Sequence, residues 1–255
     1  GLDSKPFRSV EDVITGRAIS ASIGIQFSMF VGQRAARSNW REAAWARRQA
    51  QLRHRELQTQ IVVPAALLQP PFFNLAADDA VNYGAIGAVI GHEIGHGFDD
   101  QGSTFDGDGV LRNWWTDEDR AAFEARTGAL VAQYDAFMPF EDLAVNGEFT
   151  QGENIGDLGG ITIGLLAYKM SLEGKEAPVI DEFTGTQRVF LGFAQVWRGI
   201  IRDEELRRRI ATDPHSPAIY RTNGPVRNVP EWYSAFNVTE TDALYLPPAE
   251  RVKIW

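Results

Sequence analysis

The stretch His92-Glu93-Ile94-Gly95-His96 most constrains what this chain can fold into. Two histidines four residues apart lie one turn above each other on the same face of an α-helix, so both imidazoles can reach one metal ion. The run 85–90 just before them is apolar, which predicts a buried helix from about 80 to 97. Imidazoles in a buried helix need polar partners, and zinc is an effective one. The spacing therefore predicts a zinc-binding helix rather than a solvated surface helix.

Glu93 follows the first histidine directly. At this position its carboxylate can bind and deprotonate a water molecule held by the metal instead of ligating the metal itself. This is the His-Glu-x-x-His pattern of zinc metallopeptidases, in which the glutamate is the general base. Taken alone, the same residues also occur by chance on amphipathic helices, and the apolar run before them favours the metal site.

A second pair of residues predicts the rest of the metal site. Glu153 and Asp157 are four residues apart within Gly152-Glu153-Asn154-Ile155-Gly156-Asp157, again one helical turn. Glu153 is expected to be the third zinc ligand, which leaves a fourth position open for water. Asp157 is then placed to accept the free ring N–H of a zinc-bound histidine. By itself this pair would equally fit an ordinary solvated helix face; beside the two histidines it indicates a complete zinc shell.

Composition excludes several classes of partner and site. The 255 residues carry a formal net charge of −9, which argues against nucleic acid and anionic membrane surfaces as partners. The absence of cysteine excludes disulfides and thiolate metal sites. No segment is predicted to span a bilayer, because the most apolar early stretch, 18–32, is short and interrupted by polar residues. No signal peptide is visible. We expect a soluble protein, with the cytoplasm favoured over export.

The chain is expected to form an N-terminal helical segment over 1–59 and one compact domain over 60–255. The β-branched residues of 60–64, which end at a proline, predict a short strand at the start of that domain. Thr116 and the three acids after it are typical of an N-cap and a first helical turn. The helices predicted after the zinc helix cover 116–137, 152–172 and 185–210.

Short motifs along 60–255 follow one another in an order that resembles a known family. They are Ile61-Val62-Val63-Pro64-Ala65, Leu68-Gln69-Pro70-Pro71-Phe72-Phe73, Asn82-Tyr83-Gly84, the stretch 92–100, Trp114-Trp115, Asn146-Gly147, the stretch 152–157, Phe193-Ala194-Gln195-Val196-Trp197, His215-Ser216-Pro217 and Trp255. The chain resembles the catalytic, C-terminal portion of the neprilysin family of zinc metallopeptidases. The resemblance implies an α+β, mainly helical fold that is thermolysin-like around the metal, with a small sheet near 60–64.

The resemblance also implies roles for individual residues. His92, His96 and Glu153 look like the ligands of one zinc ion per chain, and Glu93 looks like the general base. Asp157 resembles the carboxylate that supports a ligating histidine. His215 resembles the histidine that stabilises the oxyanion of the tetrahedral intermediate, and Arg221 the arginine that binds a substrate carbonyl. The apolar pocket beyond the scissile bond is expected to be lined by Leu67, Phe72, Val89, Val196 and Trp197.

The sequence departs from the family pattern at two places. The family carries an Asn-Ala-aromatic-Tyr segment ten residues before the strand isoleucine, where this chain has Gln51-Leu52-Arg53-His54. The family's catalytic domain also lies under a large N-terminal helical domain, and residues 1–59 are too few to supply it. Unless the chain is a fragment or works with an open cleft, we expect a second subunit or self-association to cover the cleft.

Two functions follow from these residues. The first is a zinc-dependent endopeptidase or oligopeptidase that cleaves peptides on the amino side of apolar residues. The alternative is a non-catalytic or partner-dependent zinc-binding subunit that binds or processes one dedicated peptide. Glu93 discriminates between them, because a structural zinc site does not require a base beside an open coordination position.

Overall fold

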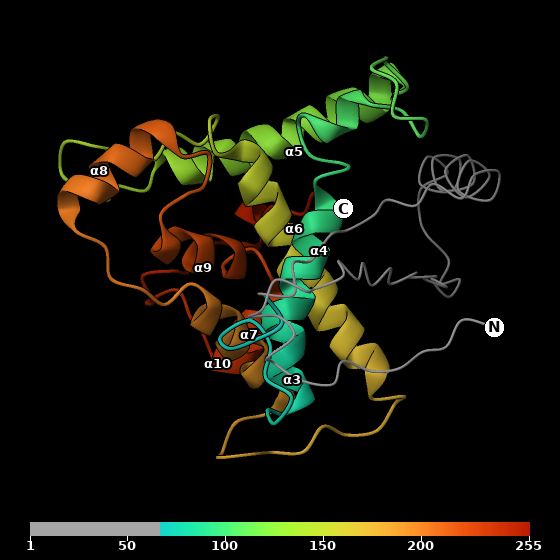
Figure 1. Ribbon diagram of the computed structural model, residues 1–255, viewed down its shortest axis with the longest axis vertical. Helices are drawn as coiled ribbons and strands as arrows, with labels where there is room; N and C mark the ends of the chain where they lie inside the picture. The colour runs from blue at the N-terminus through green and yellow to red at the C-terminus, as the bar shows by residue number, and fades with distance from the viewer. Residues whose placement is uncertain (1–66) are drawn as a thin grey trace, which may run out of the picture.

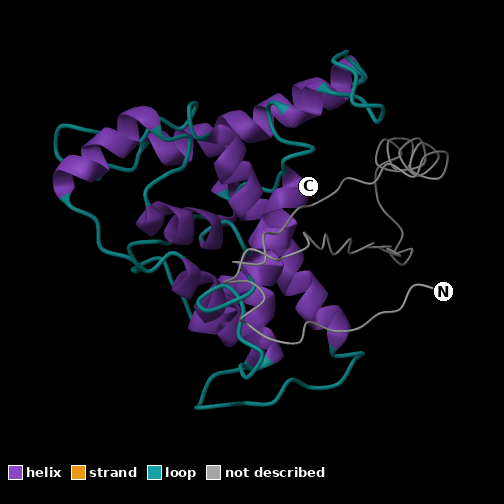
Figure 2. Ribbon diagram, in the orientation of Figure 1, coloured by secondary structure: helices purple, strands orange, loops and turns teal. Residues whose placement is uncertain are grey.

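The computed structural model describes residues 67–255, and in them helices alternate with loops (Figure 2). Strand-type pairing within these residues is limited to isolated bridges such as that between Phe105 and Leu111. The prediction of a mainly helical fold is thus confirmed. The strand and small sheet predicted near 60–64, the helical segment over 1–59 and the substitution at Gln51 lie outside the described residues and stay predictions.

The predicted zinc helix is a rod made of three successive segments (Figure 1). It begins as α3, Asp79–Asn82, where the side chain of Asp78 caps the helix by accepting from the backbone N–H of Ala80. It widens into a π-helical turn, η2, Tyr83–Gly87, and continues as α4, Ala88–Gly95. Its bounds agree with the prediction, whereas the π-helical turn has no signature in the periodicity of the sequence.

The rod lies against a core built around one long helix. The remaining helices are η3, Gly102–Thr104; α5, Asp117–Asp135; α6, Gln151–Ser171; α7, Gly185–Val196; α8, Asp203–Thr212; α9, Ala218–Val226; α10, Pro230–Phe236; and η4, Pro248–Glu250. Helix α6 crosses α4, and α5 runs across one end of both (Figure 1). The most buried core side chains come from α5, α6 and α7, among them Leu130, Tyr134, Ile155, Ile161 and Val189. No helix in this part of the chain is both long and apolar enough to cross a membrane.

Two of the predicted helices begin and end within two residues of their expected bounds. Helix α5 starts after Thr116, whose side chain accepts from the backbone N–H of Asp119 as an N-cap does. Helix α6 covers all but the last residue of the predicted span 152–172. The local signals of a cap and a helical period were therefore sufficient for these two elements.

The single helix predicted over 185–210 is wrong. The chain leaves the α7 conformation at Trp197, and a new helix, α8, starts after Arg202, whose backbone is extended. Residues 203–205 are all acidic and occupy the first turn of α8, where carboxylates interact favourably with the helix dipole. The break allows the chain to turn away from α6 and return as α9, which carries Arg221 back to Asp157 of α6.

Candidate metal centre

The helices that carry the two predicted motifs, α4 and α6, approach each other backbone to backbone. Gly91 of α4 faces Gly160 of α6, and a β-carbon on Gly91 would lie 3.1 Å from the Gly160 Cα. A β-carbon on Gly160 would lie only 2.4 Å from the carbonyl oxygen of Ala88. Glycine is required where two backbones come this close. The short helix–helix distance brings the side chains of both motifs within reach of one centre.

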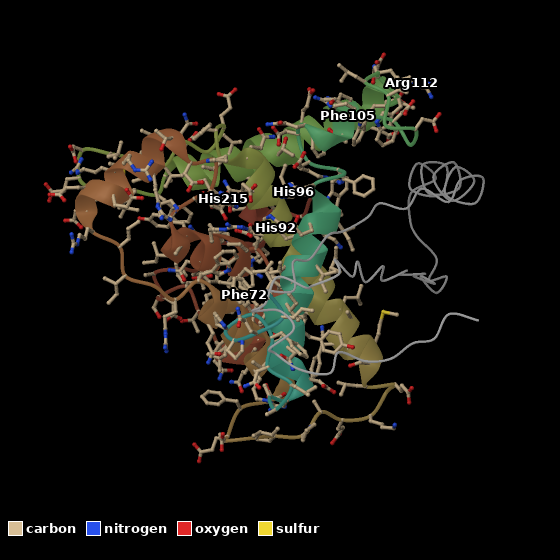
Figure 3. The ribbon with its side chains drawn as sticks, in the orientation of Figure 1. Phe72, His92, His96, Phe105, Arg112 and His215 are labelled. Carbon is tan, nitrogen blue, oxygen red and sulfur yellow. The ribbon has the colours of Figure 1, made fainter. Side chains whose placement is uncertain are left out.

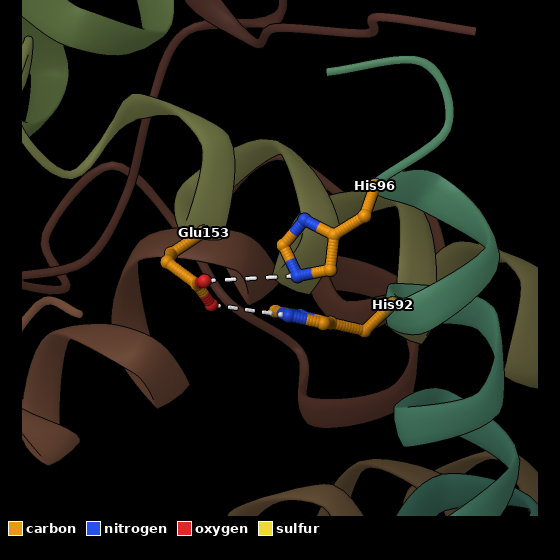
Figure 4. A group of neighbouring side chains, drawn as sticks. All are labelled: His92, His96 and Glu153. Carbon is orange, nitrogen blue, oxygen red and sulfur yellow. Dashed lines mark ion pairs between the residues drawn. The ribbon is translucent and has the colours of Figure 1, made fainter. Parts of the chain in front are cut away.

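His92, His96 and Glu153 meet at this crossing (Figure 4). One potential ligand atom from each lies within 4.8 Å of the other two. Nε2 of His92 is 3.1 Å from Glu153 Oε2, and Nε2 of His96 is 3.6 Å from Glu153 Oε1. A tetrahedral zinc ion with bonds of about 2.0–2.1 Å holds its ligand atoms roughly 3.3 Å apart. Two imidazoles and one carboxylate at these separations fit a zinc ion.

The carboxylate of Glu153 gives a second indication of a cation. Its Oε2 atom is buried and, despite lying close to imidazole nitrogens, makes no hydrogen bond of ordinary geometry. A buried carboxylate oxygen without a directed donor is costly unless a cation compensates it. The donor set and the unpaired oxygen therefore agree with the metal site that the sequence predicts.

Each of the two histidines on the rod is oriented by a carboxylate. Nδ1 of His92 lies 2.9 Å from Oδ1 of Asp157, and Nδ1 of His96 lies 2.8 Å from Oδ2 of Asp99. An Nδ1–H that donates to a carboxylate leaves Nε2 unprotonated and free to ligate a metal. The contact of Asp157 is the one expected from the sequence. Asp99 was missed, although an acid three residues after His96 was visible in the sequence.

Asp157 is also the partner of Arg221. Both residues are buried, and the guanidinium donates from Nε to Oδ2 over 2.7 Å and from Nη2 to Oδ1 over 2.8 Å. Burial raises the pKa of the Asp157 carboxyl, but the charge and hydrogen bonds of Arg221, together with His92, hold it below its ordinary value. The guanidinium carbon lies 3.9 Å from the ring centroid of Trp197. Within residues 67–255, Nη1 of Arg221 makes no hydrogen bond, whereas Nε and Nη2 donate to Asp157.

The imidazole and carboxylate groups at this crossing shift each other's pKa values. Burial lowers the pKa of His92, but its hydrogen bond to Asp157 and its ion pair with Glu153 outweigh burial and raise it to about 9. Burial raises the pKa of Glu153, but its contacts with His215 and His92 bring it well below its usual range. The carboxylates are thus ionised and the imidazole protonated at neutral pH. A divalent cation can replace these protons without leaving an uncompensated buried charge.

A third imidazole faces the same carboxylate from the loop before α9. Nε2 of His215 lies 3.0 Å from Glu153 Oε2, and its Nδ1 lies 2.7 Å from Asp213 Oδ1. The same Asp213 oxygen accepts from the backbone N–H of His215 over 3.0 Å. Figure 3 shows His92, His96 and His215 converging on one region of the molecule. The orienting role of Asp213 was also missed from the sequence, where it stands two residues before the histidine.

A pocket of about 210 Å³ opens beside these residues. The residues predicted for the apolar pocket all line it: Leu67, Phe72, Val89, Val196 and Trp197. His92, Glu93, His215 and Arg221 are among its other lining residues. Glu93 is exposed, and its side chain forms no hydrogen bond or ion pair with another residue of the described part of the chain. The structure thus brings together every site residue named from the sequence, while their chemical roles stay predictions.

Comparison with known proteins agrees with this arrangement. The model of "Peptidase family M13" matches residues 55–252. Neprilysin-1 of Caenorhabditis elegans is 44% identical over 201 residues, which cover 76% of this chain and 26% of that protein. Human neprilysin is 42% identical over 206 residues, covering 78% of this chain and 27% of its own length.

A solved structure is similar as well. The crystal structure of a Mycobacterium tuberculosis zinc metalloprotease in complex with an inhibitor has a TM-score of 0.74 and 62% sequence identity, over 75% of this chain and 30% of that one. The chain therefore spans about a quarter of the length of the curated relatives described above.

Proposed function

Because this chain belongs to peptidase family M13, we propose that it carries the active site of a zinc endopeptidase that cleaves peptide bonds on the amino side of apolar residues. The observation that carries the proposal is the position of Glu93. Its carboxylate, which is unpaired within the described part of the chain, lies on the wall of a pocket shared with His92, one residue along the helix from a proposed metal ligand.

One zinc ion per chain would be held by His92, His96 and Glu153. When bound, zinc would polarise the scissile carbonyl and make the attacking water more acidic. Glu93 accepts a proton from that water as its oxygen bonds to the carbonyl carbon. It then delivers the proton to the nitrogen of the breaking C–N bond, so that an amine leaves and the carboxylate of Glu93 is restored.

The other polar residues stabilise the negative charge that develops on the substrate, or hold the His92 ring and the peptide in position. His215 donates a hydrogen bond to the carbonyl oxygen as negative charge develops on it, and Asp213 holds the ring in place for that contact. Asp157 keeps Nε2 of His92 directed at the ligand position. Nη1 of Arg221 is directed to a carbonyl of the bound peptide, while its other nitrogens remain paired with Asp157.

The apolar wall of the pocket supports the proposed preference. The residue that follows the cleaved bond would place its side chain against Phe72, Val89 and Trp197, with the small side chains of Ala85 and Ala88 leaving space for it. Burying an apolar side chain in such a pocket is favourable by about 25 cal/mol for each Å² removed from water. A polar or charged side chain would lose hydration there without a matching partner.

Two features of the centre favour catalysis over a non-catalytic zinc-binding subunit. Structural zinc sites are closed by four protein ligands, whereas three groups gather here among the residues that the structure describes. A stabilising metal site also has no use for the carboxylate of Glu93, which has no partner among residues 67–255.

The test is cleavage of a mixed peptide pool by the zinc-loaded chain, read by mass spectrometry. Glu93→Gln runs beside it, with Glu204→Gln, the same change at an exposed position of α8, as the matched control. We expect cuts before apolar residues that persist in the control and vanish in Glu93→Gln. Absence of cleavage by a chain that holds one zinc ion, or cleavage that survives Glu93→Gln, contradicts the proposed function.

A further inference from the structure

The loop and helix that carry His215 and Arg221 are bound to α6 by ion pairs at both residues. Ser216, which lies between these two residues in the chain, makes a contact of another kind with α6. The hydroxyl of Ser216 donates to Oδ1 of Asn154 over 2.8 Å. Only 3% of Ser216 and 1% of Asn154 is exposed to solvent. This is a fully buried hydrogen bond between two uncharged side chains.

The amide of Asn154 is held in one orientation. Its Nδ2 donates to Oγ1 of Thr150 over 2.9 Å, and that hydroxyl donates in turn to the carbonyl oxygen of Asn146 over 2.9 Å. Reversing the amide would place its nitrogen against the Ser216 hydroxyl and its oxygen against the Thr150 hydroxyl, whose proton is already used. The oxygen of Asn154 is therefore fixed as the acceptor for Ser216, and separating the two would leave buried polar groups without partners.

The two residues are the direct chain neighbours of two groups in the metal centre. Ser216 follows His215, and Asn154 follows Glu153. Of the other contacts of His215, Asp213 belongs to the same loop and cannot hold that loop against α6. The contact with Glu153 involves a carboxylate proposed to ligate zinc. His215 itself is substantially exposed, so its ring has little packing to fix it.

We propose that Ser216 and Asn154 are positioning residues for His215. Their buried hydrogen bond sets the separation between the His215 loop and α6, and thereby holds the imidazole where the oxyanion forms. The role rests on the proposed function, in which His215 stabilises the developing negative charge.

The kinetic test is Ser216→Ala. Because the contact of His215 strengthens only in the transition state, we expect kcat to fall about tenfold or more and KM to change by less than about twofold. A displacement of roughly 1 Å is enough for a loss of that order. In a His215→Gln background, Ser216→Ala should cause no further fall in kcat. An unchanged kcat in the single variant, or an equal fall in both backgrounds, overturns the proposal.

Two further variants separate positioning from general destabilisation. Thr127→Ala removes a buried hydroxyl of α5 that donates to the carbonyl oxygen of Glu124, and it should leave kcat unchanged below the unfolding temperature. Asn154→Leu removes the acceptor instead of the donor, and it should lower kcat by a factor similar to that of Ser216→Ala. The two losses should not add when the variants are combined, because either change breaks the same bond. Losses that multiply overturn the proposal.

The mobility of the His215 ring can be measured without relying on activity. The chain has four histidines, so ¹³C-histidine labelling gives few ring signals, and His215→Gln assigns the one of interest. Carbon relaxation should report a lower order parameter for the His215 ring in Ser216→Ala and an unchanged one in Thr127→Ala. An unaltered ring in Ser216→Ala overturns the positioning role even if the wild-type chain cleaves no peptide. A failure of the proposed function is thereby distinguishable from a failure of this one.

Discussion

A β-carbon on Gly156 would lie 2.7 Å from Nδ1 of His92. That nitrogen is the atom that contacts Asp157. Helix α6 therefore does more than supply Glu153 and Asp157, because its backbone also forms the surface against which the imidazole of His92, a proposed zinc ligand, rests. The position of the ring depends on the absence of a side chain at residue 156.

The first prediction is that Gly156→Ala weakens zinc binding. The added methyl group must displace the imidazole of His92, which breaks its alignment with both Asp157 and the ligand position. Loss of such a supporting contact typically costs 10–100-fold in metal affinity, and we expect a loss of about that order. Competition with a chromophoric chelator measures it.

Gly159→Ala is the matched control for that experiment. It lies on the same helix, and its new β-carbon would meet only Cδ1 of Trp255, at an ordinary contact distance of 3.9 Å. Its zinc affinity should equal that of the wild type. Equal affinities for Gly156→Ala and Gly159→Ala would show that the ring does not depend on this contact.

The second prediction concerns protons released when zinc binds. The pKa of His92 is lowered by burial but raised overall to about 9 by its hydrogen bond to Asp157 and its ion pair with Glu153, so the imidazole is protonated at pH 7.5 before zinc binds. A ligating imidazole must be neutral, so zinc displaces that proton. The apparent affinity should rise with pH from 6.5 to about 9 and then level off, by about tenfold per pH unit for one proton.

Calorimetric titration of the metal-free chain in buffers of different ionisation enthalpy measures the proton count directly. We expect the observed enthalpy at pH 7.5 to vary with the buffer, with a slope that corresponds to at least one proton released per zinc ion. The His92→Gln variant should release fewer protons. An enthalpy that does not depend on the buffer would mean that His92 is already neutral before zinc arrives.

The third prediction is that Asp157→Asn destabilises the metal-free chain. The change leaves the buried guanidinium of Arg221 without its counter-charge, and breaking a buried pair from one side typically costs about 3–5 kcal/mol in the free energy of unfolding. The double variant Asp157→Asn with Arg221→Met should recover much of that loss, because the guanidinium left without its partner is removed as well. Urea unfolding in the presence of a chelator gives both values.

An exposed pair in the same chain serves as the control. Arg207 binds Asp142 in the same two-pronged way, with nitrogen–oxygen distances of 3.0 and 2.8 Å, but on the surface. Asp142→Asn should leave the free energy of unfolding unchanged within error, because solvent screens exposed ion pairs. If the two single variants lose equal stability, burial is not what makes the Asp157 pair sensitive.

The fourth prediction is that Trp197 limits the size of the apolar side chain that the pocket at the metal centre accepts. This side chain lines the pocket at the metal centre and also a second pocket of about 650 Å³ between α7 and α9. Trp197→Ala should join the two spaces and raise the ratio of cleavage before tryptophan to cleavage before leucine. The overall kcat/KM should fall, because Arg221 loses the ring over which it lies. Gln195→Ala, which alters only the second pocket, should keep the wild-type ratio. A ratio unchanged by Trp197→Ala would contradict the assignment.

The parts of the site that could be predicted from the sequence are those fixed by helical periodicity. His92 and His96 recur with the period of one turn, as do Glu153 and Asp157, so each pair was bound to share a helix face once its helix formed. The α5 cap at Thr116 was equally local. In each case the residues that decide the structure lie within a few positions of one another.

The parts that could not be predicted depend on contacts between distant segments. Asp99 and Asp213 are close in sequence to the histidines they orient, but only the path of each loop directs their oxygens to Nδ1. The break after α7 contains no proline, and its local signals are Gly199 and the three acids at 203–205, which the helical spacing of the apolar residues before them outweighed in the prediction. The approach of Gly91 to Gly160 likewise becomes meaningful only once α4 and α6 are known to be neighbours.

The π-helical turn η2 takes up one residue more than an α-helical turn would at the same place on the rod. Adding or removing one residue rotates the following part of a regular α-helix by about 100°. Deleting a single residue from Tyr83–Gly87 would instead restore an ordinary α-helical turn, so both histidines of α4 would keep their direction toward α6 and their mutual spacing. The chain can thus lose one residue at this turn and keep its three proposed ligands together, because the direction of the histidines depends on where along the rod a residue is removed.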